Sequence, residues 1–162
     1  MLLMALFLLG GSSANPEGGC VAPWSGSGDR LLGNQAPNFK LSNLSGEKVE
    51  LSRLVAQKPT LLVFWATWCP TCVEEIPTLN DWVRKYPQMQ ILSINVEESR
   101  DRVKNFSEKR QIQYPVLLDS ESQVAEQYGL VGIPATVLVS KGGRIVYYGF
   151  SLPENIETLI KE

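Results

Sequence analysis

Apolar and polar residues first alternate regularly near Phe39. Phe39 and Leu41 alternate with polar residues, a Ser-Asn-Leu-Ser-Gly turn follows, and Val49 and Leu51 resume the alternation. Because successive side chains of a strand point to opposite faces of a sheet, this pattern predicts a β-hairpin.

Two apolar runs further along predict central strands. Leu61–Trp65 reads LLVFW, and Gln90–Val96 reads QILSINV. Runs of this length and composition are typical of strands that are covered on both faces of a sheet. Between them, a helix is predicted over about 70–86, because apolar residues recur there at helical spacing. Pro77 should kink this helix, since proline removes one helix hydrogen bond.

The rest of the chain continues the alternation of helices and strands. A second helix, 100–111, should face inward through Val103 and Phe106. The remaining predictions are a short strand at 116–118, a helix at 121–128, an antiparallel pair of strands at 135–139 and 144–150, and a closing helix at 152–161. A βαβ start followed by a ββα end predicts an α/β fold in which helices flank a mixed sheet.

The N-terminal region differs from this pattern. Residues 1–14 hold an apolar run followed by small residues, which resembles a signal peptide, although the first basic residue is Arg30. The alternative is a buried or amphipathic N-terminal helix. Residues 15–34 are rich in Gly, Ser and Pro and predict a flexible linker, so 35–162 form the one expected domain. Cys20 is either a lipidation site that anchors the chain to a membrane or a free thiol.

The amino-acid composition excludes several classes of function. Hydrophobic residues make up 44% of the chain and charged residues 20%, which is typical of a globular protein. The formal net charge is -2 and the basic residues are scattered, so we expect no nucleic-acid partner. The chain contains no histidine, which excludes Ser-His-Asp and Cys-His hydrolases and metal sites of mixed Cys/His type.

The motif with the clearest chemistry is Cys69-Pro70-Thr71-Cys72, at the start of the predicted helix. Two cysteines at this spacing can close a small disulfide ring, and unpaired N–H groups at a helix start favour an anion. This geometry lowers a thiol pKa from about 8.5 to about 7 or below. We therefore expect Cys69 to be the attacking nucleophile and Cys72, one turn deeper, to resolve the mixed disulfide.

The same motif has two other interpretations. It can be half of a metal site, but four-coordinate zinc needs two more ligands, and of the 3 cysteines only Cys20 is left. It can also be a structural disulfide, although so small a loop adds little stability. We expect no metal and no cofactor.

The chain resembles the thioredoxin superfamily, and more narrowly the TlpA/ResA-type extracytoplasmic thiol-disulfide oxidoreductases. The resemblance rests on WATWCPTC over 65–72 and on GIPAT over 132–136, together with APNF over 36–39. It covers the chain from about Gly33 to the C-terminus. It implies a thioredoxin-like fold, here with an extra N-terminal β-hairpin.

The resemblance also implies roles for individual residues. Pro134 would be a cis-proline that faces the cysteines, and the backbone of Ile133 would pair with the substrate. Glu75, three positions after the second cysteine, would handle protons, with an exposed helix carboxylate as the alternative. Trp68 would shield Cys69 and, with Pro70 and Thr71, would contact the substrate, whereas Phe64 and Trp65 would belong to the core.

Two positions depart from the family pattern. Val63 stands where ordinary thioredoxins have a buried aspartate, so the proton for Cys72 must come from elsewhere. Ala135 stands where cytochrome-maturation members often have glutamate, which weakens an assignment to haem delivery.

The hypothesis is a reductase of protein disulfides in the periplasm or another extracytoplasmic space, with cytochrome c maturation as one setting. Its partners would be disulfide-containing protein substrates and a membrane thiol donor of the CcdA/DsbD type. The alternatives are a disulfide-forming oxidase, a peroxidase, and a metal-delivery module on the same fold.

Overall fold

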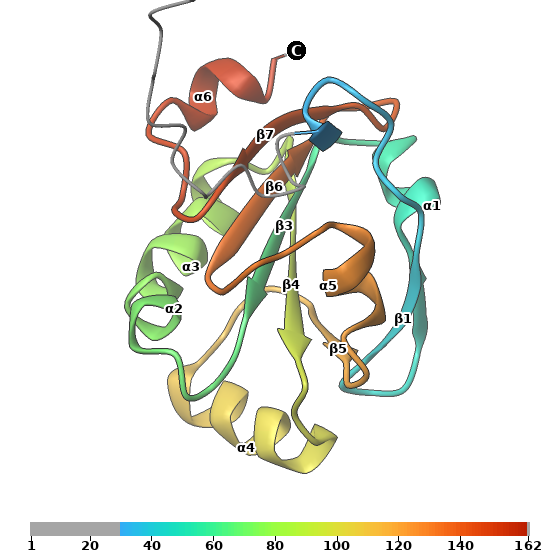
Figure 1. The fold of residues 1–162 in the computed structure, drawn as a ribbon. Coiled ribbons are helices and arrows are strands. Elements are labelled where there is room, and N and C mark those ends of the chain that lie inside the picture. Colours follow the sequence, from blue (N-terminus) through green and yellow to red (C-terminus); the bar gives the residue numbers. More distant parts are fainter. Residues whose placement is uncertain (1–29, 162) are drawn as a thin grey trace, which may run out of the picture.

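The computed structural model describes residues 30–161 as a mixed sheet with helices on both faces (Figure 1). Residues 1–14, most of the linker and Cys20 lie outside this part of the chain. Its elements are β1 (Lys40–Asn43), β2 (Lys48–Glu50), α1 (Leu51–Val55), β3 (Thr60–Trp65), α2 (Pro70–Glu74), α3 (Ile76–Lys85), β4 (Gln90–Val96), α4 (Arg100–Arg110), β5 (Val116–Asp119), α5 (Gln123–Gln127), β6 (Ala135–Val139), β7 (Ile145–Gly149) and α6 (Ile156–Leu159).

The sheet has the strand order β2-β1-β5-β4-β3-β6-β7. β3 and β5 run parallel to β4, whereas the other neighbouring strands are antiparallel. This confirms the expected mixed sheet. Every residue of β3 is buried, as its unbroken apolar sequence predicts for a strand between two covered faces.

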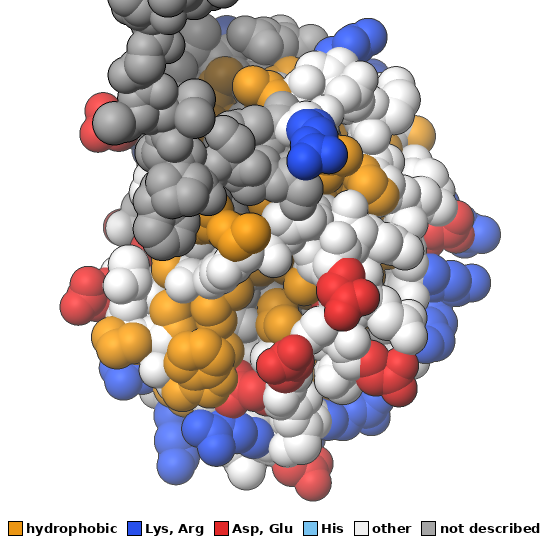
Figure 2. All heavy atoms as spheres, in the orientation of Figure 1, with side chains coloured by type: hydrophobic (Ala, Val, Ile, Leu, Met, Phe, Trp, Pro, Cys, Tyr) orange, Lys and Arg blue, Asp and Glu red, His pale blue; other side chains and the backbone are white. Residues whose placement is uncertain are grey.

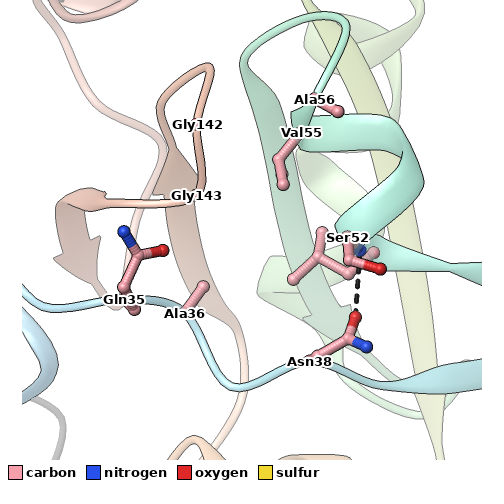
Figure 3. Close-up of a pocket in the computed structure, with 9 residues that line it drawn as sticks. Gln35, Ala36, Asn38, Ser52, Val55, Ala56, Gly142 and Gly143 are labelled. Carbon is pink, nitrogen blue, oxygen red and sulfur yellow. Dashed lines mark hydrogen bonds between the residues drawn. The ribbon is translucent and has the colours of Figure 1, made fainter.

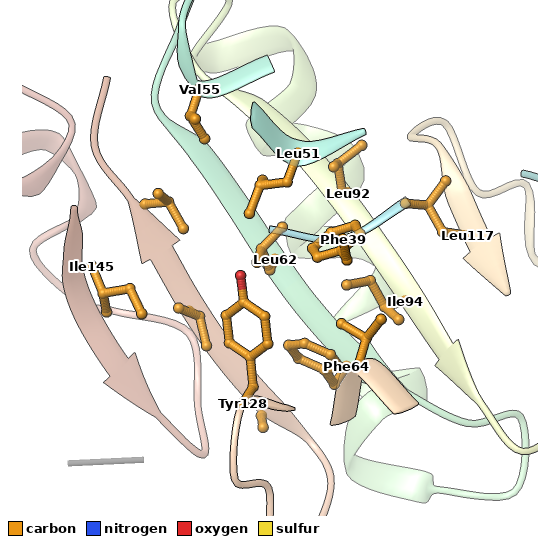
Figure 4. Close-up of a cluster of buried hydrophobic side chains, with 14 residues drawn as sticks. Phe39, Leu51, Val55, Leu62, Phe64, Leu92, Ile94, Leu117, Tyr128 and Ile145 are labelled. Carbon is orange, nitrogen blue, oxygen red and sulfur yellow. The ribbon is translucent and has the colours of Figure 1, made fainter. Parts of the chain in front are cut away.

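The two faces of β3 supply two separate parts of the core. Leu62 and Phe64 face a cluster that includes residues of α1 and α5, whereas Leu61 and Val63 face a cluster with residues of α3 and α6. Tyr128 lies in the middle of the first cluster, beside Phe64 (Figure 4). Its ring is fully buried, and its hydroxyl donates a hydrogen bond to the Pro37 carbonyl at 2.8 Å.

The predicted helix over 70–86 is two helices that meet at Glu75. Pro77 explains the break, because it cannot donate to the carbonyl four residues earlier and its ring crowds that carbonyl. The prediction for Leu51 is wrong. This residue begins α1 instead of ending a strand, and it is buried in the first cluster.

The described chain already contacts the sheet before β1. The Gly33 amide donates to the Ile145 carbonyl at 2.8 Å, and Gln35 forms an isolated bridge with Arg144. A pocket of about 310 Å³ opens between this segment, α1 and the turn after β6 (Figure 3). Thr60, the first residue of β3, pairs with Val139 at the end of β6, so the pocket lies at the end of the sheet where β3 begins.

Candidate functional site

The candidate site lies at the opposite end of the sheet, where β3 passes into α2. The Cys69 amide donates to the Ala66 carbonyl at 3.2 Å, which closes a tight turn after the strand. Cys69 is the N-cap of α2 and has extended backbone angles, which suit a residue that precedes proline. Pro70 occupies the first turn of the helix, where its missing N–H has no cost.

Cys69 and Cys72 form a disulfide, with Cα atoms 5.3 Å apart. The Cys69 sulfur also accepts a hydrogen bond from the Cys72 amide at 3.3 Å. Both cysteines are buried, in a cluster with Trp65 and Val103. The α2 start thus directs a backbone donor at the Cys69 sulfur, which is the arrangement that stabilises a thiolate.

The residues around the disulfide are more exposed to solvent than the two cysteines themselves. Trp68 is 64% exposed, and Pro70 and Thr71 are also exposed, although both sulfur-bearing residues are buried. In Figure 2, hydrophobic side chains gather over the region of α2 and its preceding loop. A partner can therefore contact the rim of the disulfide without rearrangement of the core.

The loop before β6 lies against the same cluster. Ile133 packs on the cluster that contains both cysteines, and the Ile133–Pro134 peptide bond is cis, as the family resemblance implies. Pro134 is buried, whereas Ile133 is partly exposed. The structure therefore brings Cys69, Cys72 and Ile133 together from segments more than sixty residues apart.

A groove of about 570 Å³ begins beside this loop. Its walls include Trp68, Val131 and Ile133, and Val131 is 65% exposed. Two carboxylates, from Glu97 and Glu126, also line it. The groove offers an apolar surface with an acidic border next to Trp68, the neighbour of Cys69 in the chain, and Figure 2 shows acidic side chains near α5.

Glu75 lies between α2 and α3 rather than on an exposed helix face. Burial raises the pKa of its carboxyl group, while the Leu152 backbone amide acts in the opposite direction. Its Oε2 atom is buried and has no hydrogen-bond partner among the described residues. Glu74, in contrast, is exposed. A carboxyl group in this environment keeps its proton to a higher pH and can donate it.

The sequence analysis missed Glu98, the buried carboxylate nearest to the turn that carries Cys69. One oxygen accepts from the Thr67 amide at 2.7 Å and from Asn95 at 2.8 Å, and the other accepts from the Thr67 hydroxyl at 2.6 Å. Arg102 forms a salt bridge with it at 2.8 Å. Burial alone would raise the pKa of Glu98, but these hydrogen bonds and Arg102 together lower it. The i,i+4 spacing to Arg102 was the only signal of this network in the sequence.

Two features are absent from the part of the chain that the structure describes. Residues 30–161 contain no cluster of three or more acidic or cysteine side chains that could hold a metal ion. No helix within these residues has the length and apolar character needed to cross a membrane.

Comparison with known proteins identifies related sequences and folds. Residues 32–148 match the model of the AhpC/TSA family. The chain is 31% identical over 135 residues to the thiol-disulfide oxidoreductase ResA of Bacillus thuringiensis subsp. konkukian, which covers 81% of this chain and 78% of the relative. It is 35% identical over 116 residues to ResA of Bacillus subtilis, over 70% of this chain and 64% of the relative.

A solved structure with a similar fold is that of a putative thiol:disulfide interchange protein DsbE from Chlorobium tepidum. Its TM-score is 0.73 at 26% sequence identity, and the match covers 80% of this chain and 95% of that one.

Proposed function

Because this chain belongs to the AhpC/TSA family and, within it, to the ResA-type thiol-disulfide oxidoreductases, we propose that it reduces protein disulfides outside the cytoplasm. One observation carries the proposal. The Cys69–Cys72 disulfide lies at the start of α2, beneath exposed residues and against the Ile133–Pro134 loop.

The first step is attack by Cys69 on a substrate disulfide. In the reduced protein, the Cys69 thiolate would form a bond to one substrate sulfur, and the substrate S–S bond would break. The second substrate sulfur leaves as a thiolate and takes up a proton. A position at the N-cap of α2 favours the thiolate form of Cys69, because the backbone donor points at its sulfur.

The second step is resolution by Cys72. The Cys72 thiolate attacks Cys69, which re-forms the disulfide seen here and releases the substrate as a dithiol. Two electrons thus pass from the protein to the substrate. Before this attack the Cys72 thiol must lose its proton, and Glu75 supports the step as the group that accepts it. Val63, at the position of the aspartate in ordinary thioredoxins, has no titratable group and cannot do so, whereas the raised pKa of Glu75 makes its carboxylate a stronger proton acceptor.

Substrate binding would use the surface around the disulfide. Trp68, Pro70 and Thr71 around it are exposed, and Ile133 packs on the cluster that contains both cysteines. The backbone of Ile133 would pair with an extended substrate segment whose cysteine reaches the disulfide. The groove beside Ile133 would hold the side chains that flank that cysteine.

The setting would be the periplasm or another extracytoplasmic space. The signal-like residues 1–14 support it, and Cys20 is the position where the chain would be lipidated and anchored. A membrane protein of the CcdA/DsbD type would return Cys69 and Cys72 to the dithiol form by supplying two electrons. Cytochrome c maturation is the process in which we expect the substrate to act.

Two measurements test this function. A Cys72→Ser variant should accumulate mixed disulfides through Cys69 in cells, and their mass-spectrometric identification would name the substrates. The reduction potential gives the direction, and a reductase should lie near the thioredoxin end of the range, about -270 mV. A potential near -120 mV, as in strong oxidases of this fold, would contradict the reductase proposal.

A further inference from the structure

The buried carboxylate of Glu98 binds the turn that carries Cys69, although 31 positions separate it from Thr67 in the sequence. It accepts hydrogen bonds from both the backbone amide and the hydroxyl of Thr67, at 2.7 and 2.6 Å. Arg102 closes a triangle, because its Nε atom contacts the Glu98 carboxylate at 2.8 Å and the Thr67 hydroxyl at 2.9 Å. Two side chains, Glu98 and Arg102, therefore restrain one residue of the turn.

Thr67 is the residue whose position fixes the rest of this turn. It lies between Ala66, whose carbonyl accepts from the Cys69 amide, and Trp68, which borders the groove. A shift of Thr67 would therefore move Cys69 relative to the first N–H groups of α2. Supporting residues of this kind hold a reactive group within a few tenths of an ångström of its working position.

We propose that Glu98 is a positioning residue, which holds the Cys69 sulfur at the N-cap of α2 by restraining Thr67 from the loop after β4. A buried carboxylate without a structural or functional role is rare, because removing its charge from water is costly unless it is paired. Here Asn95, Thr67 and Arg102 supply that pairing. The inference rests on the proposed attack by Cys69, since only a reactive sulfur needs this restraint.

Thr67→Val tests the restraint without a change in charge. The variant loses the hydroxyl but keeps the backbone amide, so the turn is loosened while Glu98 and Arg102 stay charged. We expect the rate of iodoacetamide alkylation of reduced Cys69 at pH 7 to fall about fivefold, because a displaced sulfur loses the N–H groups that stabilise its thiolate. Thr67→Ser should restore the rate, because it returns the hydroxyl.

Glu98→Gln separates position from charge. If Glu98 acts only through its negative charge, its removal should speed alkylation of Cys69, and Thr67→Val should have no effect. If Glu98 positions the turn, both variants should slow alkylation. Asp101→Asn is the matched control, because it removes an exposed carboxylate from the adjacent helix turn and should leave the rate unchanged.

The outcomes are distinct. Slower alkylation in Thr67→Val and Glu98→Gln, with recovery in Thr67→Ser, supports the positioning role. A lower melting temperature with an unchanged alkylation rate overturns it, because Glu98 would then serve stability alone. If wild-type Cys69 itself reacts like an ordinary thiol over the pH range, the proposed function fails instead, and the wild-type titration shows this before any variant is compared.

Discussion

The Cys72 backbone amide donates a hydrogen bond to the Cys69 sulfur at 3.3 Å. The donor belongs to the first turn of α2, whose N–H groups have no partners within the helix. The two cysteines thus have different surroundings. The Cys69 sulfur accepts a hydrogen bond from an N–H group at the start of α2, whereas Cys72 lies one turn inside the helix. In the proposed mechanism, this asymmetry makes Cys69 the sulfur that reacts first.

Alkylation of the reduced protein should report that asymmetry. If the pKa of Cys69 lies near 7, compared with about 8.5 for an ordinary thiol, its thiolate fraction at pH 7 is about fifteenfold larger. Brief exposure to iodoacetamide at pH 7 should therefore label Cys69 well before Cys72. Peptide mass spectrometry measures the ratio. Equal labelling of the two cysteines would remove the basis for Cys69 as the nucleophile.

Trp68 should contribute to substrate binding rather than to stability. It is 64% exposed, so Trp68→Ala should change the free energy of unfolding by about 0.5 kcal/mol or less. The rate with a protein disulfide substrate should fall about tenfold, since a truncated aromatic contact at a binding surface costs more than 1 kcal/mol. Alkylation of Cys69 by iodoacetamide should not slow, because the backbone donor that stabilises the Cys69 thiolate is unchanged.

Phe150→Ala is the matched control for Trp68→Ala. Phe150 is another exposed aromatic residue, at 51%, but it lies just after β7 and does not line the groove. Its loss should leave both rates unchanged. If Phe150→Ala slowed protein-disulfide reduction as much as Trp68→Ala, the effect would not be specific to the proposed binding surface.

The central part of the fold could be predicted from local pattern. The runs LLVFW and QILSINV predict β3 and β4, because a strand that is covered on both faces is apolar along nearly its whole length. Pro70 indicated the start of α2 because proline suits the first helical turn. The position of Cys69 at a helix N-cap was therefore accessible from the sequence alone.

The rest of the site depends on contacts between distant segments. The cis bond before Pro134 followed only from the family resemblance, because an X-Pro bond is usually trans. In the sequence, Glu98 is one of several acidic residues near a helix start, and only the packing of β4 beside β3 brings it to Thr67. Helix α1 has five residues, too few for a periodic pattern to stand out.

Tyr128→Phe should destabilise the protein by about 1 to 2 kcal/mol, because the partly buried Pro37 carbonyl would lose its donor. Chemical denaturation measures this difference. Tyr147→Phe is the control, since the Tyr147 hydroxyl donates to the Ser151 carbonyl at an exposed position. If Tyr147→Phe lowered the free energy of unfolding by as much, the burial of Tyr128 would not explain the destabilisation.

Glu75 should make stability depend on pH in a defined direction. Burial raises its pKa above the ordinary value of 4.5, so the folded protein holds this proton more tightly than the unfolded chain. The stabilisation is complete below pH 4.5 and is lost as the pH rises through the folded-state pKa. Compared with wild type, Glu75→Gln should therefore gain in relative stability across this window, whereas Glu74→Gln, which removes an exposed carboxylate, should follow the wild-type curve.

The same pair of variants tests the role of Glu75 in proton transfer. General acid–base groups contribute about a hundredfold or more to rates, so Glu75→Gln should slow the release of substrate from the mixed disulfide by at least about tenfold. The initial attack by Cys69 should change less, since its thiolate is stabilised by the start of α2. Stopped-flow measurement of the two phases separates these steps. Equal effects of Glu75→Gln and Glu74→Gln on the second phase would reduce Glu75 to a partly buried carboxylate with no part in the reaction.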